Sequence, residues 1–176
     1  MKNKLNRSGF TLIEILAVII ILGIIMVIAV PSVSNYILDS RKNTYVSTIK
    51  GYADAVRNKI NNFEYSLSNK DIAYYVPISN IELDKGGNSP FGDWVSAYVV
   101  VTYNGREHSY YWTSVDTSGY KVILEKKVED ITTSDIINDT ELSISTRKGI
   151  AGRDRTCVVD ENGICNSSDI MDAISE

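Results

Sequence analysis

The chain has 176 residues, of which 44% are apolar and 23% charged, and its formal net charge is −4. This length and composition fit one compact domain plus a separate apolar helix, and they exclude two sizeable domains. The acidic balance argues against nucleic-acid binding, which depends on a basic surface.

Residues 1–9 hold three basic side chains and no acid, and an apolar tract follows over residues 10–33. Every residue from 15 to 30 is apolar or glycine. With its flanks the tract reaches the roughly 20 residues with which a helix crosses a hydrocarbon layer of about 30 Å. We therefore expect a membrane helix, and the positive-inside rule places Met1 in the cytoplasm and the chain after residue 33 outside.

A secretory signal peptide also combines a basic start with an apolar run, but it ends in a small-residue A-x-A cleavage site. After the tract the chain reads Pro31-Ser32-Val33-Ser34, which matches that site poorly. Gly9 instead lies between the basic leader and the apolar tract. A cut after Gly9 would free Phe10 and keep the whole apolar helix.

The run Arg7-Ser8-Gly9-Phe10-Thr11-Leu12-Ile13-Glu14, with the apolar tract behind it, resembles the processing site of type IV prepilins and of the related pseudopilins of type II secretion. The resemblance covers about residues 4–36. It implies that a membrane aspartyl protease, the prepilin peptidase, cuts after Gly9. It further implies that the new N-terminal Phe10 is methylated and that Glu14 is needed for assembly.

Glu14 is the one charged residue between positions 8 and 38. A carboxylate at the centre of a membrane helix costs about 2.5–3.5 kcal/mol on insertion scales, so its presence suggests a function. One interpretation is that Glu14, near the helix start, reaches the headgroups and favours the positive end of the helix dipole. The other is that the α-amino group freed on Phe10, of the same or a neighbouring subunit, neutralises it and sets the register between subunits.

Gly23 and Pro31 interrupt the apolar tract. In a helix interior glycine costs about 1 kcal/mol and proline about 3 kcal/mol relative to alanine, and proline removes a backbone donor. Membrane helices nevertheless tolerate both residues. In the type IV pilin family a glycine and a proline at these places bound a segment that can lose helical structure in the filament. The resemblance therefore makes Gly23 and Pro31 candidates for helix-weakening positions.

Residues 34–63 are predicted to continue the helix as an amphipathic half. Apolar residues recur there at steps of three and four, at Tyr45, Ile49, Tyr52, Val56, Ile60 and Phe63, with Val46 and Ala53 beside them. This spacing is typical of a helix with one buried face. A continuous helix from Phe10 to Phe63 would extend roughly 81 Å at 1.5 Å per residue.

Residues 64–93 are predicted as a connecting region, with loop signals on both sides of an apolar patch from Ile72 to Ile81. Because Pro77 interrupts the patch, we expect at most a short strand or a helical turn.

Residues 94–128 carry the clearest strand signals. Trp94 to Tyr103 is rich in β-branched and aromatic residues, and Asn104-Gly105 predicts a type I′ turn into a second strand from residue 106 to 116. A turn at residues 117–119 leads to a third strand over residues 120–128. We expect an antiparallel sheet whose one face covers the stripe of the helix.

Residues 129–176 form an acidic C-terminal region with 11 acidic and 4 basic side chains. A short helix is predicted near residues 134–138 and a weak strand over residues 142–146. The basic side chains lie within nine residues, at Arg147, Lys148, Arg153 and Arg155. They form either a patch that docks on the acidic surface of a neighbouring subunit or an anionic ligand, or a solvated loop.

Cys157 and Cys165 flank a turn-forming Asp-Glu-Asn-Gly sequence, which predicts a hairpin that brings them together. An oxidising exterior would allow a disulfide, although many pilins close a much larger loop. A zinc site is poorly supported because the chain offers only these cysteines and His108.

The sequence contains no glycine-rich phosphate loop, no Gly-x-Ser-x-Gly element and no paired metal-ligand motif. We therefore expect no enzyme, no cofactor and no metal.

The predicted fold class is α+β and pilin-like, with a long N-terminal helix packed on an antiparallel sheet. Cleavage after Gly9 would leave 15 basic and 22 acidic side chains, a net charge of −7 for the mature chain.

The resemblance implies a type IV pilus subunit that waits in the cytoplasmic membrane and then joins a helical surface filament. Its partners would be copies of itself, the prepilin peptidase and the assembly machinery. Such filaments serve adhesion, aggregation, biofilm formation or twitching motility. The alternatives are a type II secretion pseudopilin, a competence pilus subunit that binds DNA, or a monomeric single-pass membrane protein with an outward binding domain.

Overall fold

The computed structural model describes residues 10–83, 86–122, 126–139, 153, 155–165 and 170–172. The chain divides into two compact units, residues 1–40 and 41–176. One helix, α1, runs from Leu12 to Asn61 and contributes to both units. The long N-terminal helix and the α+β, pilin-like architecture predicted from the sequence are confirmed.

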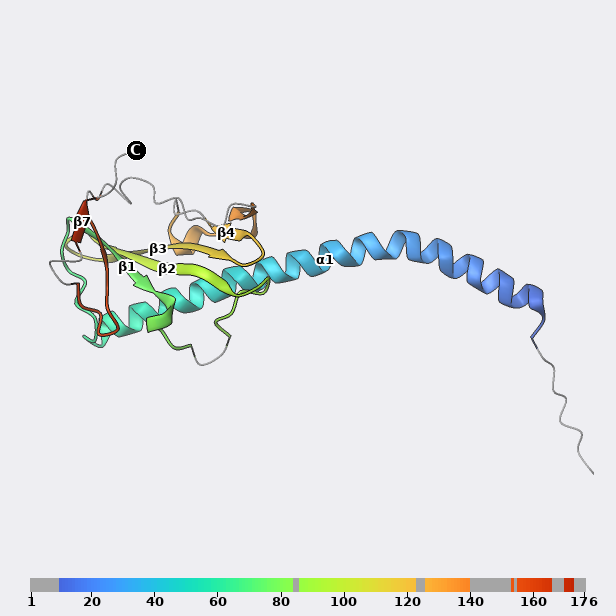
Figure 1. Ribbon diagram of the computed structural model, residues 1–176, viewed down its shortest axis with the longest axis horizontal. Coiled ribbons are helices and arrows are strands. Elements are labelled where there is room, and N and C mark those ends of the chain that lie inside the picture. The colour runs from blue at the N-terminus through green and yellow to red at the C-terminus, as the bar shows by residue number, and fades with distance from the viewer. Residues whose placement is uncertain are drawn as a thin grey trace, which may run out of the picture. The chain divides into compact units, whose positions relative to one another are not determined.

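In the first unit, the large apolar side chains of α1 are exposed along its length, from Leu12 to Leu38. In the second unit, one stripe of α1 is buried, formed by Tyr45, Ile49, Tyr52, Ala53 and Val56. The predicted spacing is confirmed at these positions. The sheet of the second unit lies across this part of the helix (Figure 1).

The end of α1 departs from the prediction, because the stripe does not extend to Phe63. The Phe63 N–H donates to the Ile60 carbonyl (3.0 Å), and the Glu64 N–H donates to the Lys59 carbonyl (2.9 Å). This pair of bonds is the Schellman motif, which requires a left-handed residue and usually places glycine there. Phe63 adopts φ +60°, a left-handed conformation that costs a non-glycine residue about 1–2 kcal/mol. Its side chain is 94% exposed.

The described strands form one seven-stranded sheet with the order β5-β4-β3-β2-β1-β6-β7. Their bounds are Ile72–Pro77 (β1), Trp94–Tyr103 (β2), His108–Asp116 (β3), Tyr120–Val122 (β4), Ile136–Asn138 (β5), Arg155–Val158 (β6) and Ile170–Asp172 (β7). All neighbours pair antiparallel except β1 and β6, which run parallel. The sheet is therefore mixed, whereas the sequence predicted an antiparallel one.

The central hairpin of β2 and β3 is present, but its turn is not type I′. Tyr103 pairs with His108, so the loop has four residues. The Asn104 N–H donates to the Glu107 carbonyl (3.2 Å), and the Asn104 side-chain oxygen accepts from the N–H groups of Arg106 and Glu107. A type I′ turn requires positive φ at both central residues, but among the described non-glycine residues only Phe63 has it.

The predicted connecting region of residues 64–93 contains a central strand of the sheet. Ile72, Tyr74 and Val76 of β1 face the main core with α1, while Ala73 and Tyr75 belong to a second cluster with Val100. Because both faces of β1 are buried, its sequence shows no polar alternation. The 3₁₀ turn η1 (Ile78–Asn80) follows β1 directly.

The C-terminal region differs from its prediction at several places. A single 3₁₀ turn, η3 (Thr133–Asp135), and strand β5 replace the helix predicted near residues 134–138. A further 3₁₀ turn, η2, spans Val128–Asp130, where the third strand was predicted to end. The strand predicted over residues 142–146 lies outside the described residues.

The core of the second unit is aromatic. Trp112 is fully buried, stacks on Tyr52 with 5.7 Å between the ring centroids, and meets Trp94 edge-on at 5.8 Å. The Tyr45 ring meets Trp94 at 5.1 Å, and its hydroxyl lies 2.9 Å from the Ser114 hydroxyl. Burial raises the pKa of the Tyr45 hydroxyl well above its ordinary value.

Candidate functional site

The N-terminus of α1 is closed by a reciprocal pair of hydrogen bonds between Thr11 and Glu14. The Thr11 N–H donates to Glu14 Oε2 at 2.8 Å, and the Glu14 N–H donates to Thr11 Oγ1 at 3.3 Å. The Thr11 hydroxyl also donates to Glu14 Oε2, at 2.9 Å. This is a capping box, in which an N-cap threonine and a glutamate three residues later satisfy each other's backbone donors.

This capping role of Glu14 was not predicted from the sequence. The Thr-x-x-Glu spacing before an apolar run is the sequence signal that could have revealed it. Both bonds from Thr11 use the same oxygen, Oε2. Among the described residues, no hydrogen bond reaches the other oxygen, Oε1. The carboxylate also lies in the first turn, where the helix dipole favours negative charge. One oxygen of the carboxylate is thus bonded within the chain, and the other accepts no described hydrogen bond.

The predicted cleavage site directly precedes this box. Phe10 is not helical and its side chain is 86% exposed, while Gly9 lies outside the described residues. Only Thr11 separates Phe10 from the first residue of the helix.

The apolar half of α1 is long enough and apolar enough to cross a membrane, judged by length and composition. Its helix continues through both predicted weak points, Gly23 and Pro31. No described heavy atom lies within 4 Å of a methyl group added at Gly23, apart from the helix's own backbone. After Pro31, the hydroxyls of Ser32 and Ser34 donate to the carbonyls of Ile28 (3.2 Å) and Val30 (3.0 Å), a bonding mode that tends to bend helices.

Cys157 and Cys165 form a disulfide, with 6.1 Å between their Cα atoms. The loop between them turns on Asp160, whose carboxylate accepts from the N–H groups of Asn162 (2.9 Å) and Ile164 (2.8 Å). Gly163, at φ +72°, lies so close to the Tyr65 ring that a Cβ there would overlap it. The disulfide therefore closes a small loop that packs just beyond the end of α1.

Arg147 and Lys148 of the predicted basic patch lie outside the described residues, so the patch stays a prediction. Arg153 donates from Nη2 to the Tyr103 carbonyl at 2.8 Å. Arg155 begins strand β6, pairs in register with Ile72, and is exposed.

One buried carboxylate, whose hydrogen bonds stabilise the fold, was not singled out from the sequence. Asp116 is fully buried at the end of β3. Its Oδ2 accepts from the Ser89 hydroxyl at 2.6 Å, and its Oδ1 accepts from the N–H groups of Ser118 and Tyr120, both at 3.0 Å. These bonds hold the β3–β4 turn and join it to the loop before β2. Within the described ranges, no three His, Cys, Asp or Glu side chains form a metal-binding group.

Comparison with protein-family models matches residues 4–30 to the prokaryotic N-terminal methylation motif, the class III signal of type IV pilins. The match includes the Gly9–Phe10 junction, Thr11, Glu14 and Gly23. Searches of curated proteins and of solved structures find no match. The motif indicates processing of the pilin and pseudopilin type and points to a structural protein.

Proposed function

Because the chain carries the class III signal of type IV pilins, we propose that it is a structural subunit of a type IV pilus. The observation that carries the proposal is the methylation motif at residues 4–30, placed at the start of a helix that is long and apolar enough to span a membrane. The pilin-like α+β fold of the chain supports the same conclusion.

In this proposal the precursor is anchored in the cytoplasmic membrane with residues 1–9 inside and the globular unit outside. The prepilin peptidase hydrolyses the peptide bond after Gly9, and the new amino group of Phe10 is methylated. The exposed, non-helical backbone at Phe10 fits a protease substrate, because a protease must bind its substrate in an extended form.

Glu14 then aligns subunits within the filament. Its Oε2 is held by Thr11, so the carboxylate has a fixed direction, and its Oε1 accepts from the Phe10 amino group of a neighbouring subunit. A carboxylate that loses this partner in an apolar bundle would stay uncompensated, at a cost of about 3 kcal/mol or more. This penalty selects one axial register among the many that apolar packing alone would permit.

Gly23 and Pro31 bound the segment in which helical structure is weakest. A locally weak helix lets the apolar half leave the bilayer, bend into the filament core and extend under load. The backbone bonds of Ser32 and Ser34 fall at the same edge of the segment.

The assembled filament consists of many copies of this chain, added by the pilus assembly machinery. Head-to-tail contacts that do not close produce fibres rather than rings. By resemblance to the pilins, the filament acts in surface attachment, aggregation, biofilm formation or twitching motility. The net negative charge of the mature chain argues against specific nucleic-acid binding, which depends on a basic surface.

The test is to shear filaments from cells that produce the chain and to identify their subunits. We expect filaments built from this chain. A processed chain that stays in the membrane while protein secretion depends on it would indicate the pseudopilin alternative. A chain that keeps residues 1–9 and forms no filaments would indicate the monomeric membrane protein.

A further inference from the structure

Phe63 is held in a strained conformation and exposed at the end of α1. Its φ of +60° is the only positive value among the described non-glycine residues, and its side chain is 94% exposed. A glycine would complete the same helix end without strain. Because the ring contributes almost no buried area within its own chain, the fold gives no reason for an aromatic residue here.

The surroundings of Phe63 are polar but carry little unbalanced charge. Two neutral amides, Asn61 and Asn62, precede it. The nearest charges along the chain, Lys59 and Glu64, form an ion pair with each other at 3.2 Å. Phe63 is therefore an exposed aromatic side chain that an uncharged cavity with aromatic walls would accept.

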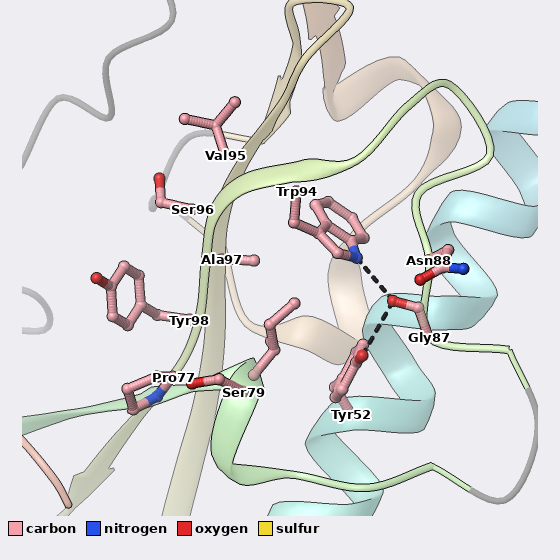
Figure 2. A pocket seen from close by; sticks show the side chains of 11 residues that line it. Tyr52, Pro77, Ser79, Gly87, Asn88, Trp94, Val95, Ser96, Ala97 and Tyr98 are labelled. Carbon is pink, nitrogen blue, oxygen red and sulfur yellow. Dashed lines mark hydrogen bonds between the residues drawn. The ribbon is translucent and has the colours of Figure 1, made fainter.

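The second unit has a cavity of about 450 Å³ beside strand β2, lined by aromatic, aliphatic and uncharged polar residues. Its walls include Tyr52, Pro77, Trp94, Val95, Ser96 and Tyr98, and none of the described residues that line it is charged. Figure 2 shows Trp94 and Tyr52 pointing towards Gly87, whereas Val95, Ser96 and Tyr98 lie on the other side of β2. Because residues from both faces of β2 line the cavity, it follows the edge of this strand.

That edge lacks a partner strand along part of its length. The pairing of β1 with β2 ends at Pro77 and Tyr98, where β1 turns into η1. Within the part of the chain that the structure describes, residues 94–97 of β2 pair with β3 on one side and with no strand on the other. Polar groups of another chain can therefore hydrogen-bond to this edge while a neighbouring side chain enters the cavity.

The aromatic walls are fixed in advance. The Gly87 carbonyl accepts from the Tyr52 hydroxyl at 2.9 Å and from Trp94 Nε1 at 2.7 Å. These bonds hold both rings in place, so a bound side chain would meet a preformed surface. Preorganised aromatic sites with little charge are typical of the central contacts in protein interfaces.

We propose that Phe63 of one subunit inserts into the cavity beside Trp94 to Tyr98 of another copy of this chain. This inference rests on the proposed function, because it requires a polymer. The inserting side chain and the receiving cavity are different surfaces of one unit, so the contact is heterologous and can repeat along a fibre. The amides of Asn61 and Asn62 lie next to the inserted ring, where they can bond to the open edge of β2.

The first test is site-directed cross-linking in cells that assemble the full chain. Asn62→Cys, which keeps the Phe63 ring, is combined with Ser96→Cys, and the matched control combines Asn62→Cys with Arg106→Cys, which is exposed on the β2–β3 loop. Both native cysteines are engaged in the disulfide, so they do not compete. Mild oxidation or a short bis-maleimide is expected to link the first pair into a ladder of multimers and to leave the control monomeric.

The second test separates stability from assembly. Phe63→Gly removes the ring and the strain, so the thermal midpoint of the solubilised full chain should rise by about 2–4 °C. Filament yield should fall by about tenfold or more, because a central aromatic anchor is lost. Phe63→Tyr keeps the ring and should keep normal filaments.

The outcomes distinguish this inference from the proposed function. If Phe63→Gly gives a normal filament yield, or if filaments form without the specific cross-link, the proposed Phe63 contact is wrong. Either result would leave the proposal of a pilus subunit unaffected. If the unmodified chain forms no filaments at all, the proposed function fails and this inference fails with it.

Discussion

Thr11 and Glu14 close the start of α1 through a single carboxylate oxygen. The Thr11 N–H and hydroxyl both donate to Glu14 Oε2, at 2.8 and 2.9 Å. The sequence left open a local role of Glu14 at the helix start and a role between subunits; the hydrogen bonds to Oε2 are local, and the role between subunits stays a prediction. The two roles can be tested separately.

Replacing Glu14 by glutamine separates capping from charge. Glutamine can also form a capping box, so Glu14→Gln should keep the helix start, whereas Glu14→Ala loses the box and the charge together. We expect both variants to be processed after Gly9 and to fail in filament assembly, because each lacks the charge that pairs with the Phe10 amino group. Filament number and length are measured by electron microscopy of sheared preparations.

The matched control is Thr11→Ala, which weakens the cap by about 0.5–2 kcal/mol and keeps the charge of Glu14. This variant should still form filaments. If Glu14→Gln assembles normally and Thr11→Ala does not, the cap rather than the charge matters for assembly.

Gly163, the one glycine between Cys157 and Cys165, should not tolerate a side chain. Alanine there would combine the strain of φ +72° with overlap of the Tyr65 ring, and we expect a loss of about 2–4 kcal/mol in the free energy of unfolding. Gly86→Ala is the control, because Gly86 has a similar φ of +80° and no described heavy atom lies within 4 Å of an added Cβ. The Gly86→Ala variant should lose only about 1–2 kcal/mol in the free energy of unfolding. Equal losses in chemical denaturation would contradict the contact with Tyr65.

Removal of the Cys157–Cys165 disulfide should destabilise the second unit. For a closed loop of about nine residues, the chain-entropy relation gives about 2.6 kcal/mol. The double variant Cys157→Ser with Cys165→Ser is compared with the unmodified chain, with and without reductant, by chemical denaturation. Reductant should lower the stability of the unmodified chain only. A double variant as stable as the oxidised chain would show that the bond adds nothing.

The second unit should lose stability in strong alkali because of its buried tyrosines. Burial raises the pKa of Tyr75 from 10.0 to about 12. Between these values the folded chain keeps the phenol proton that the unfolded chain has released. Unfolding therefore releases a proton, and the free energy of unfolding is unchanged below about pH 10 and falls as the pH rises towards 12.

Tyr75→Phe is the matched variant for this prediction, since the ring is kept and the titrating group is removed. Its stability should decline less steeply above pH 10 than that of the unmodified chain. Denaturation curves at several pH values, with tyrosinate absorbance in parallel, measure the difference. Parallel declines in the two proteins would contradict the burial of the Tyr75 hydroxyl.

The features that the sequence predicted well are those that local periodicity determines. The stripe from Tyr45 to Val56 follows the helical repeat, and the long strands β2 and β3 are rich in β-branched and aromatic residues. Each of these sequence patterns lies within one helix or strand, so it could be recognised without knowing which other element packs against it. Phe63 shows the limit, because the helical spacing continues through it while the backbone turns left-handed.

The features that were missed or left open depend on distant pairing or on burial of both faces. Strand β1 has no polar alternation, and its parallel partner β6 comes from residues 155–158, far along the chain. Strands β5 and β7 have three residues each, too few for a periodic signal. In the candidate site, the Thr-x-x-Glu spacing was visible in the sequence. The coordinates were needed to show that both donors of Thr11 bond to the same Glu14 oxygen, Oε2.

The central claim is that this chain is a processed pilus subunit, and the mass of the mature protein tests it most directly. The intact mass of the chain recovered from the cell surface should correspond to residues 10–176 with one added methyl group on Phe10. A mature chain that still begins at Met1 would contradict the claim.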